Sequence, residues 1–153
     1  MVATMRRTFL WINFVLASII VVGVFVQAYL IASYTMGAGQ DALDAHGVVG
    51  GLVIHLSELL VFLTAFGAWP RAWRWIGFTF LLFVVGTVQI FLLPEDSDNV
   101  STSAAYVHGL HGLFALIVLV MAAIIAHRGM RDLGLRRASR GGDAGTAPPQ
   151  PLP

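Results

Sequence analysis

The sequence contains no cysteine and has few charged residues. Of its 153 residues, 11% are charged and 58% are hydrophobic, whereas about a quarter are charged in an ordinary globular domain. The absence of cysteine excludes a disulfide scaffold, and lysine is absent too, since all nine basic residues are arginine. A mean hydropathy of +0.81 excludes a disordered chain and argues against a soluble enzyme. We therefore expect a membrane protein.

Four long apolar runs follow one another along the chain. They cover residues 8–33, 45–69, 75–93 and 104–126. The first has 26 residues, which exceeds the about 20 needed to cross a bilayer and is too long for a cleavable signal peptide. Pro70 and Pro94 end the second and third runs. Because a single apolar segment in lipid must be helical, the sequence predicts an all-α, four-helix transmembrane bundle within a single domain, residues 1–137.

The arginines lie on one side of the predicted membrane. They are Arg6, Arg7, Arg71, Arg74, Arg128, Arg131, Arg136, Arg137 and Arg140. The connections 34–44 and 94–103 carry acidic residues and no basic residue. Because arginine near a span resists translocation, we expect both termini in the cytoplasm of a bacterium, with the protein in the plasma membrane. The Gly- and Pro-rich tail, residues 138–153, is expected to be disordered.

An internal repeat relates the two halves of the chain. A shift of 62 residues places Gln27 over Gln89 and His46 over His108, with VQAYL against VQIFL and AHGVVGG against VHGLHGL. The repeat is parallel, with a pseudo-twofold axis along the membrane normal. His46 and His108 should then approach each other from opposite helices at one depth.

The starts of the second and fourth helices support this equal depth. The predicted N-caps are Asp41, with Asp44 three residues on, for the second helix and Ser101 or Ser103 for the fourth. Small residues follow both histidines, and they either let the helices pack closely or clear space for a flat cofactor. These small residues are Gly47, Gly50, Gly109 and Gly112.

Two imidazoles on opposite helices are what a six-coordinate haem b requires. The sequence thus predicts a haem b site between His46 and His108. One alternative is that these histidines are interfacial residues that reach water. A second is a zinc or copper site, in which His108 and His111 share one helical face and His46 is a third ligand.

Other polar residues lie within the predicted spans. Glu58 is near the middle of the second span, so it should face the interior and be neutral or paired, with His55 three residues away as its nearest partner. His55 is about 180° from His46 on an ideal helix, which suggests a contact with a partner subunit. Gln27 and Gln89 are expected to form hydrogen bonds between helices, with donation to a haem propionate as the alternative. The remaining candidates are interfacial: Trp11, Trp69, Trp73, Trp75 and His127.

Over about residues 7–131, the chain resembles small actinobacterial four-helix membrane proteins of unknown function. The resemblance is carried by VQAYL, DAHGVVGGLVIHLSELL, TVQIFLLP and VHGLHGLFAL. The bundle is also similar to one half of haem A synthase, in which a histidine near the outer end of the second and fourth helices faces haem. That resemblance implies haem-facing roles for His46 and His108. Gly47 and Gly109 stand where that family commonly has arginine, which argues against haem A synthesis.

Three hypotheses on function follow. The first is haem b binding for electron transfer or haem handling. The second is a non-enzymatic membrane subunit with protein partners, and the third is a small proton-coupled transporter component that uses Glu58. The sequence shows no nucleophile with a base and no phosphate loop, so it assigns no enzymatic activity. Its partner is the lipid bilayer, and no nucleic acid is expected.

Overall fold

The computed structural model describes residues 2–92 and 101–135. Of these residues, 91% are helical and none lie in a strand. The elements are α1 (Val2–Ser33), η1 (Tyr34–Ala38), α2 (Gln40–Val48), η2 (Val49–Ile54), α3 (His55–Ala68), α4 (Trp73–Ile90) and α5 (Thr102–Asp132). The all-α prediction is confirmed.

Four helical rods are long and apolar enough to cross a membrane. They are α1 with η1, the continuous rod Gln40–Ala68, α4 and α5. The rod Gln40–Ala68 joins α2, η2 and α3, and its η2 segment is π-helical. The chain therefore has the architecture of a multi-pass membrane protein.

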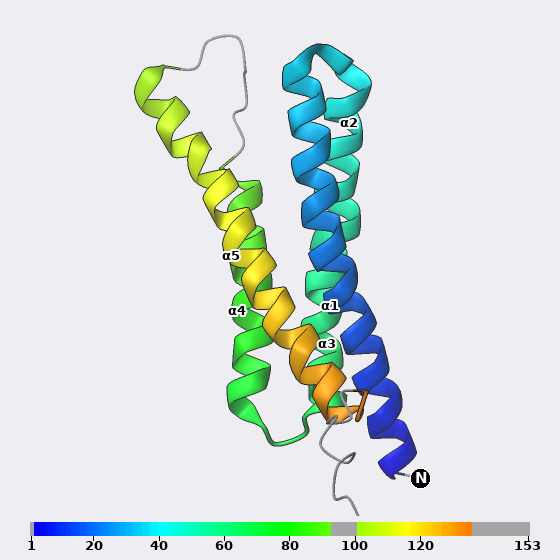
Figure 1. The fold of residues 1–153 in the computed structure, drawn as a ribbon. Coiled ribbons are helices and arrows are strands. Elements are labelled where there is room, and N and C mark those ends of the chain that lie inside the picture. The colour runs from blue at the N-terminus through cyan, green and yellow to red at the C-terminus, as the bar shows by residue number, and fades with distance from the viewer. Residues whose placement is uncertain (1, 93–100, 136–153) are drawn as a thin grey trace, which may run out of the picture.

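The rods form an antiparallel ring. α1 packs against α3 and α5, and α4 packs against the same two helices, so the second and fourth spans face each other across the bundle. Figure 1 shows α1 beside the α2–α3 rod, whereas α5 leans away from α1 toward its own N-terminus. The two hairpins therefore lie closest at the end where α1 begins and α5 ends.

Local sequence explains most of the helix ends. α3 ends at Ala68 because Trp69 precedes Pro70, which disfavours helical geometry there. Ser101 is the N-cap of α5 and accepts a hydrogen bond from the Ala104 N–H at 3.2 Å, as predicted. The prediction that Asp41, with Asp44 three residues on, caps the second helix was wrong, because α2 has no side-chain cap.

The turn between α1 and α2 is made by glycine. Gly37 and Gly39 have φ angles of 96° and 85°, a region that residues with a side chain rarely adopt. Gly39 precedes α2, whose first turn has no side-chain cap, and the Asp44 carboxylate accepts instead from the Gln40 amide at 3.0 Å. The chain thus enters α2 earlier than the predicted start at Ala45.

The helices extend beyond the predicted spans on the arginine side. α1 begins at Val2 and α5 ends at Asp132, because a helix does not have to stop where the hydrocarbon ends. Several predicted features lie outside the described residues: Leu93 and Pro94 of the third span, the acidic residues Glu95, Asp96 and Asp98, Arg136, Arg137 and Arg140, and the tail 138–153.

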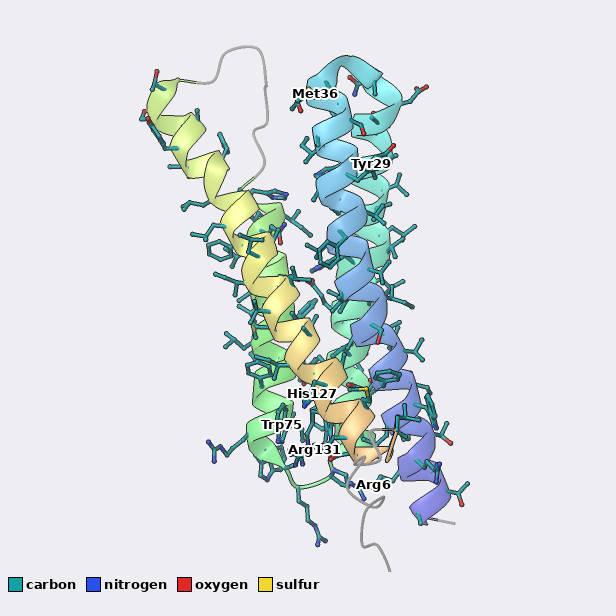
Figure 2. All side chains as sticks on the ribbon, in the orientation of Figure 1. Arg6, Tyr29, Met36, Trp75, His127 and Arg131 are labelled. Carbon is teal, nitrogen blue, oxygen red and sulfur yellow. The ribbon has the colours of Figure 1, made fainter. Side chains whose placement is uncertain are left out.

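Branched and small apolar residues fill the bundle interior. Ile20, Val61, Leu82 and Ile125 are fully buried, whereas many large apolar side chains project outward, as lipid-facing residues do. Figure 2 labels Tyr29 and Met36 at the end opposite Arg6 and Arg131. Among the described residues, the buried polar side chains are those of Asn13, Ser57, Glu58 and Thr79.

Candidate functional site

His46 lies against α1 near the end of the bundle that carries the α1–α2 turn. Its Nδ1 atom is 3.2 Å from the main-chain oxygen of Gln27. Because a carbonyl oxygen only accepts, Nδ1 carries the hydrogen and donates it. The neutral ring then keeps the lone pair on Nε2, as a metal-ligating imidazole does.

His111 on α5 repeats this arrangement in the second hairpin. Its Nδ1 donates to the main-chain oxygen of Gln89 at 3.0 Å. The Gln89 side-chain nitrogen lies 3.3 Å from His111 Nε2 and donates a hydrogen bond to the lone pair on that atom. The prediction that Gln89 bonds between helices is therefore confirmed. The side-chain oxygen of Gln27, by contrast, is buried and has no hydrogen-bond partner among the described residues.

The structure pairs His46 with His111 rather than with His108. The His46 and His111 rings have centres 6.3 Å apart and planes inclined by 48°. His108 is one turn nearer the start of α5, and its Nδ1 donates to the Leu92 main-chain oxygen at 2.7 Å. The matched glutamine carbonyls therefore make His111 the structural counterpart of His46. The prediction that His46 approaches His108 was wrong, because the imidazole of the fourth span that lies next to His46 is that of His111.

The three histidines do not form a conventional metal cluster. Among residues 2–92 and 101–135, no group of three or more histidine, aspartate or glutamate side chains is placed to hold a metal ion. His46, His108 and His111 all belong to these residues. The zinc or copper alternative consequently gains no support from the geometry.

The glycines beside the histidines separate into two kinds. A Cβ atom on Gly50 would overlap the Gln27 side chain, so Gly50 permits close helix packing. A Cβ atom on Gly47, Gly109 or Gly112 would meet no other atom within 4 Å. These three glycines are exposed, and no neighbouring helix packs against them.

Glu58 lies inside the bundle on α3, as predicted. Only 1% of the residue is exposed, and one carboxylate oxygen is 3.0 Å from His55 Nδ1. The carboxylate also abuts Gly86 of α4, where a Cβ atom would overlap it. The expectation that Glu58 faces the interior with His55 as its partner is confirmed.

His55 faces α4. Its ring stacks on Phe83 with centres 5.3 Å apart and planes 23° from parallel. The inference that His46 and His55 require opposite faces assumed an ideal α-helix, but η2 lies between them. The wider π-helical turns, with i→i+5 bonding, change the angle between the two side chains, so both contact neighbouring helices of the same chain.

Sequence reasoning missed a polar contact between α1 and α3. Asn13 is fully buried, and its amide donates to the Val61 carbonyl at 2.8 Å and to the Thr64 hydroxyl at 3.0 Å. An asparagine inside an apolar run was the available signal. Its side-chain oxygen has no partner among the described residues.

A second missed group lies at the arginine-bearing end. Asp132 accepts from Trp69 Nε1 and Arg128 Nε, both at 2.9 Å, and the Arg128 guanidinium lies 4.9 Å from the centre of the Trp75 ring. Trp69 is buried within the bundle, so it does not face lipid as a residue of an aromatic belt does. His127 is exposed, in agreement with its predicted interfacial position.

Comparisons with protein-family models, curated proteins and solved structures give no match to this chain. The resemblances to the actinobacterial family and to haem A synthase therefore stay predictions.

Proposed function

We propose that the chain binds haem b between its two helical hairpins and serves in electron transfer or haem handling. The observation that carries this proposal is the imidazole pair of His46 and His111, contributed by the second and fourth spans with ring centres 6.3 Å apart. If haem were bound here, His46 and His111 would hold its iron through their Nε2 atoms.

The hydrogen bonds of both histidines favour this role. Each Nδ1 donates to a glutamine main-chain oxygen, which fixes the ring and leaves Nε2 as the ligating atom. The Gln89 amide would have to turn away from His111 Nε2 for that nitrogen to bind iron. When bound, haem supplies one-electron transfer. His108, fixed in the same way by Leu92, is the alternative ligand from α5.

The surroundings of the pair suit a flat cofactor. Gly47 and Gly112 follow the two histidines directly, and a Cβ atom on either glycine would meet nothing within 4 Å. α5 also leans away from α1 at this end (Figure 1). A porphyrin could therefore enter between the hairpins if side chains and α5 move. The apolar interior of a helical bundle is the setting that b-type haem favours.

The proposal includes an orientation in the membrane. The described arginines lie near the end where α1 begins and α5 ends, and arginine-rich ends stay in the cytoplasm. We place this end on the cytoplasmic side of a bacterial plasma membrane. The imidazole pair then lies near the outer face.

Purification from haem-replete cells tests the haem site. A low-spin b-type spectrum is expected, and His46→Ala or His111→Ala should abolish it or convert it to a five-coordinate form. His127→Ala is the matched control and should leave the spectrum unchanged. If His108→Ala rather than His111→Ala alters the spectrum, the ligand is His108. A colourless wild-type protein would contradict haem binding.

A second function, proton handling at Glu58, is favoured by a separate observation. Only 1% of Glu58 is exposed, and among residues 2–92 and 101–135 its carboxylate forms a hydrogen bond with His55 alone. The sequences of α1 and α4 add no titratable side chain between Arg7 and Tyr29 or after Arg74, so the pair can share one proton without a second charge nearby. Infrared spectroscopy should show a protonated carboxyl band that Glu58→Gln removes. A carboxylate that titrates at the ordinary value of about 4 would contradict this function.

A further inference from the structure

An open groove of about 720 Å³ lies at the arginine-bearing end of the bundle. Its lining residues come from the α3–α4 connection, the first turns of α4 and one position on α5. The main ones are Arg71, Trp73, Arg74, Trp75, Phe78 and Ile124. Figure 2 shows Trp75 at the same end as Arg6 and Arg131.

Positive charge gathers at the outer part of this groove. Arg71 and Arg74 are exposed, and within the described part of the chain neither belongs to an ion pair. The nearby Arg128 is already paired with Asp132 at 2.9 Å. No acidic residue is among the lining residues. The two arginines therefore present uncompensated charge to a ligand.

The backbone at Arg71 holds this residue in an unusual conformation. Its φ angle is 70°, and Arg71 is the one described residue other than glycine with a positive φ. That region is unfavourable for a residue with a side chain. The connection Trp69–Ala72 is closed by a hydrogen bond from the Ala72 N–H to the Trp69 carbonyl at 3.0 Å, which keeps Arg71 next to the start of α4.

The groove becomes apolar away from the arginines. Phe78 lies five residues inside the start of α4, about 7 Å along its axis, and Ile124 lies two turns before Asp132 on α5. In sequence, Trp73 lies between the two arginines, and Trp75 lies between Arg74 and the apolar Phe78. Tryptophan favours the boundary between headgroups and hydrocarbon.

We propose that this groove binds an anionic phospholipid. Its phosphate lies between Arg71 and Arg74, where guanidinium groups form charge-assisted hydrogen bonds with phosphate oxygens. Its acyl chain follows Trp75 to Phe78 and Ile124. The apolar floor distinguishes a lipid from a free phosphate ion, which would gain nothing from these side chains. The site is separate from the histidines and does not depend on haem.

Titration of the detergent-purified protein with phosphatidylglycerol, followed by native mass spectrometry, tests the proposal. The variant Arg71→Gln/Arg74→Gln should bind this lipid roughly 30-fold more weakly, at the usual contribution of each basic residue near a lipid surface. The variant Arg7→Gln/Arg131→Gln loses the same charge from exposed positions that do not line the groove. It should bind as the wild type does.

Two further measurements separate the alternatives. Circular dichroism without added lipid should give the same melting temperature for the wild type and both arginine variants, since the substituted arginines are exposed. Inorganic phosphate at millimolar concentration should not displace the lipid. Phe78→Ala should lower the affinity of the protein for the lipid. Wild-type affinity in the Arg71→Gln/Arg74→Gln variant would overturn the proposal. Equal loss of lipid in both arginine variants, or displacement by phosphate without any effect of Phe78→Ala, would overturn it as well.

Discussion

The carboxylate of Glu58 occupies the space that a side chain on Gly86 would need. Glu58 belongs to α3 and Gly86 to α4, so one helix backbone forms a wall of the other helix's acidic site. A buried acid held in this way is shielded from lipid by main chain. The close approach of α3 and α4 and the burial of the acid are thus one feature.

This relationship predicts that Gly86→Ala destabilises the protein. An added methyl group would force Glu58 aside or separate α3 from α4, and such overpacking costs about 1–3 kcal/mol. The loss should appear in unfolding of the detergent-purified protein by denaturant. Gly77→Ala is the matched control on α4, because its Cβ atom would meet nothing within 4 Å.

The same experiment can identify Glu58 as the cause. In a Glu58→Ala background, Gly86→Ala should have a smaller effect, because the overlapping carboxylate is gone. Equal destabilisation in both backgrounds would show that another neighbour of Gly86 is responsible.

The Glu58–His55 pair predicts different outcomes for two substitutions. Glu58→Gln keeps the shape and a hydrogen-bonding group next to His55, so unfolding should change by less than about 1 kcal/mol. His55→Ala leaves a buried acid without its 3.0 Å partner and should cost about 1–3 kcal/mol. Denaturant unfolding at neutral pH measures both. If His55→Ala were the milder change, the contact would contribute nothing to stability.

The hydrogen bond between Asp132 and Trp69 predicts a second effect on stability, at the arginine-bearing end of the bundle. Asp132→Ala removes the acceptor of the Trp69 N–H, and Trp69 is only 3% exposed. A buried donor without an acceptor costs about 1–3 kcal/mol. Asp132→Asn retains an oxygen and should be milder. The exposed neighbour Arg131 serves as a control, and Arg131→Ala should leave thermal unfolding unchanged.

The proposed orientation predicts the activity of reporter fusions. Alkaline phosphatase fused after Gln40 should be active, because that turn is expected outside, whereas a fusion after Arg74 should be inactive. The alkaline phosphatase activity of the two fusions is measured in intact cells and compared. The opposite pattern would place the imidazole pair on the cytoplasmic side.

The sequence predicts the spans and the Glu58 site well because both follow from solvation. An apolar run in lipid must be helical, and a carboxylate in the same run must turn inward and find a partner. These arguments need no knowledge of the loops. They are therefore insensitive to how the helices are aligned with one another.

The choice between His108 and His111 depends on the loops. A shift of 62 residues matches Gln27 with Gln89 and therefore His46 with His108. In the structure, Gln27 contacts His46, which lies 19 positions later in the sequence, whereas Gln89 contacts His111, which lies 22 positions later. An alignment without gaps cannot contain this three-residue difference. Asn13 was missed for a different reason, since its shorter hydrogen bond goes to the Val61 main-chain oxygen, which no side-chain pattern reveals.

The π-helical η2 divides the second span into two halves, α2 and α3, that are set at different rotations. The α2 half directs His46 toward α1 and α5, and the α3 half directs His55 and Glu58 toward α4. Loss of one residue within Val49–Ile54 would turn one half against the other by about 100°. The spacing between His46 and Glu58 is consequently far less tolerant of insertion or deletion than the identity of the apolar residues between them.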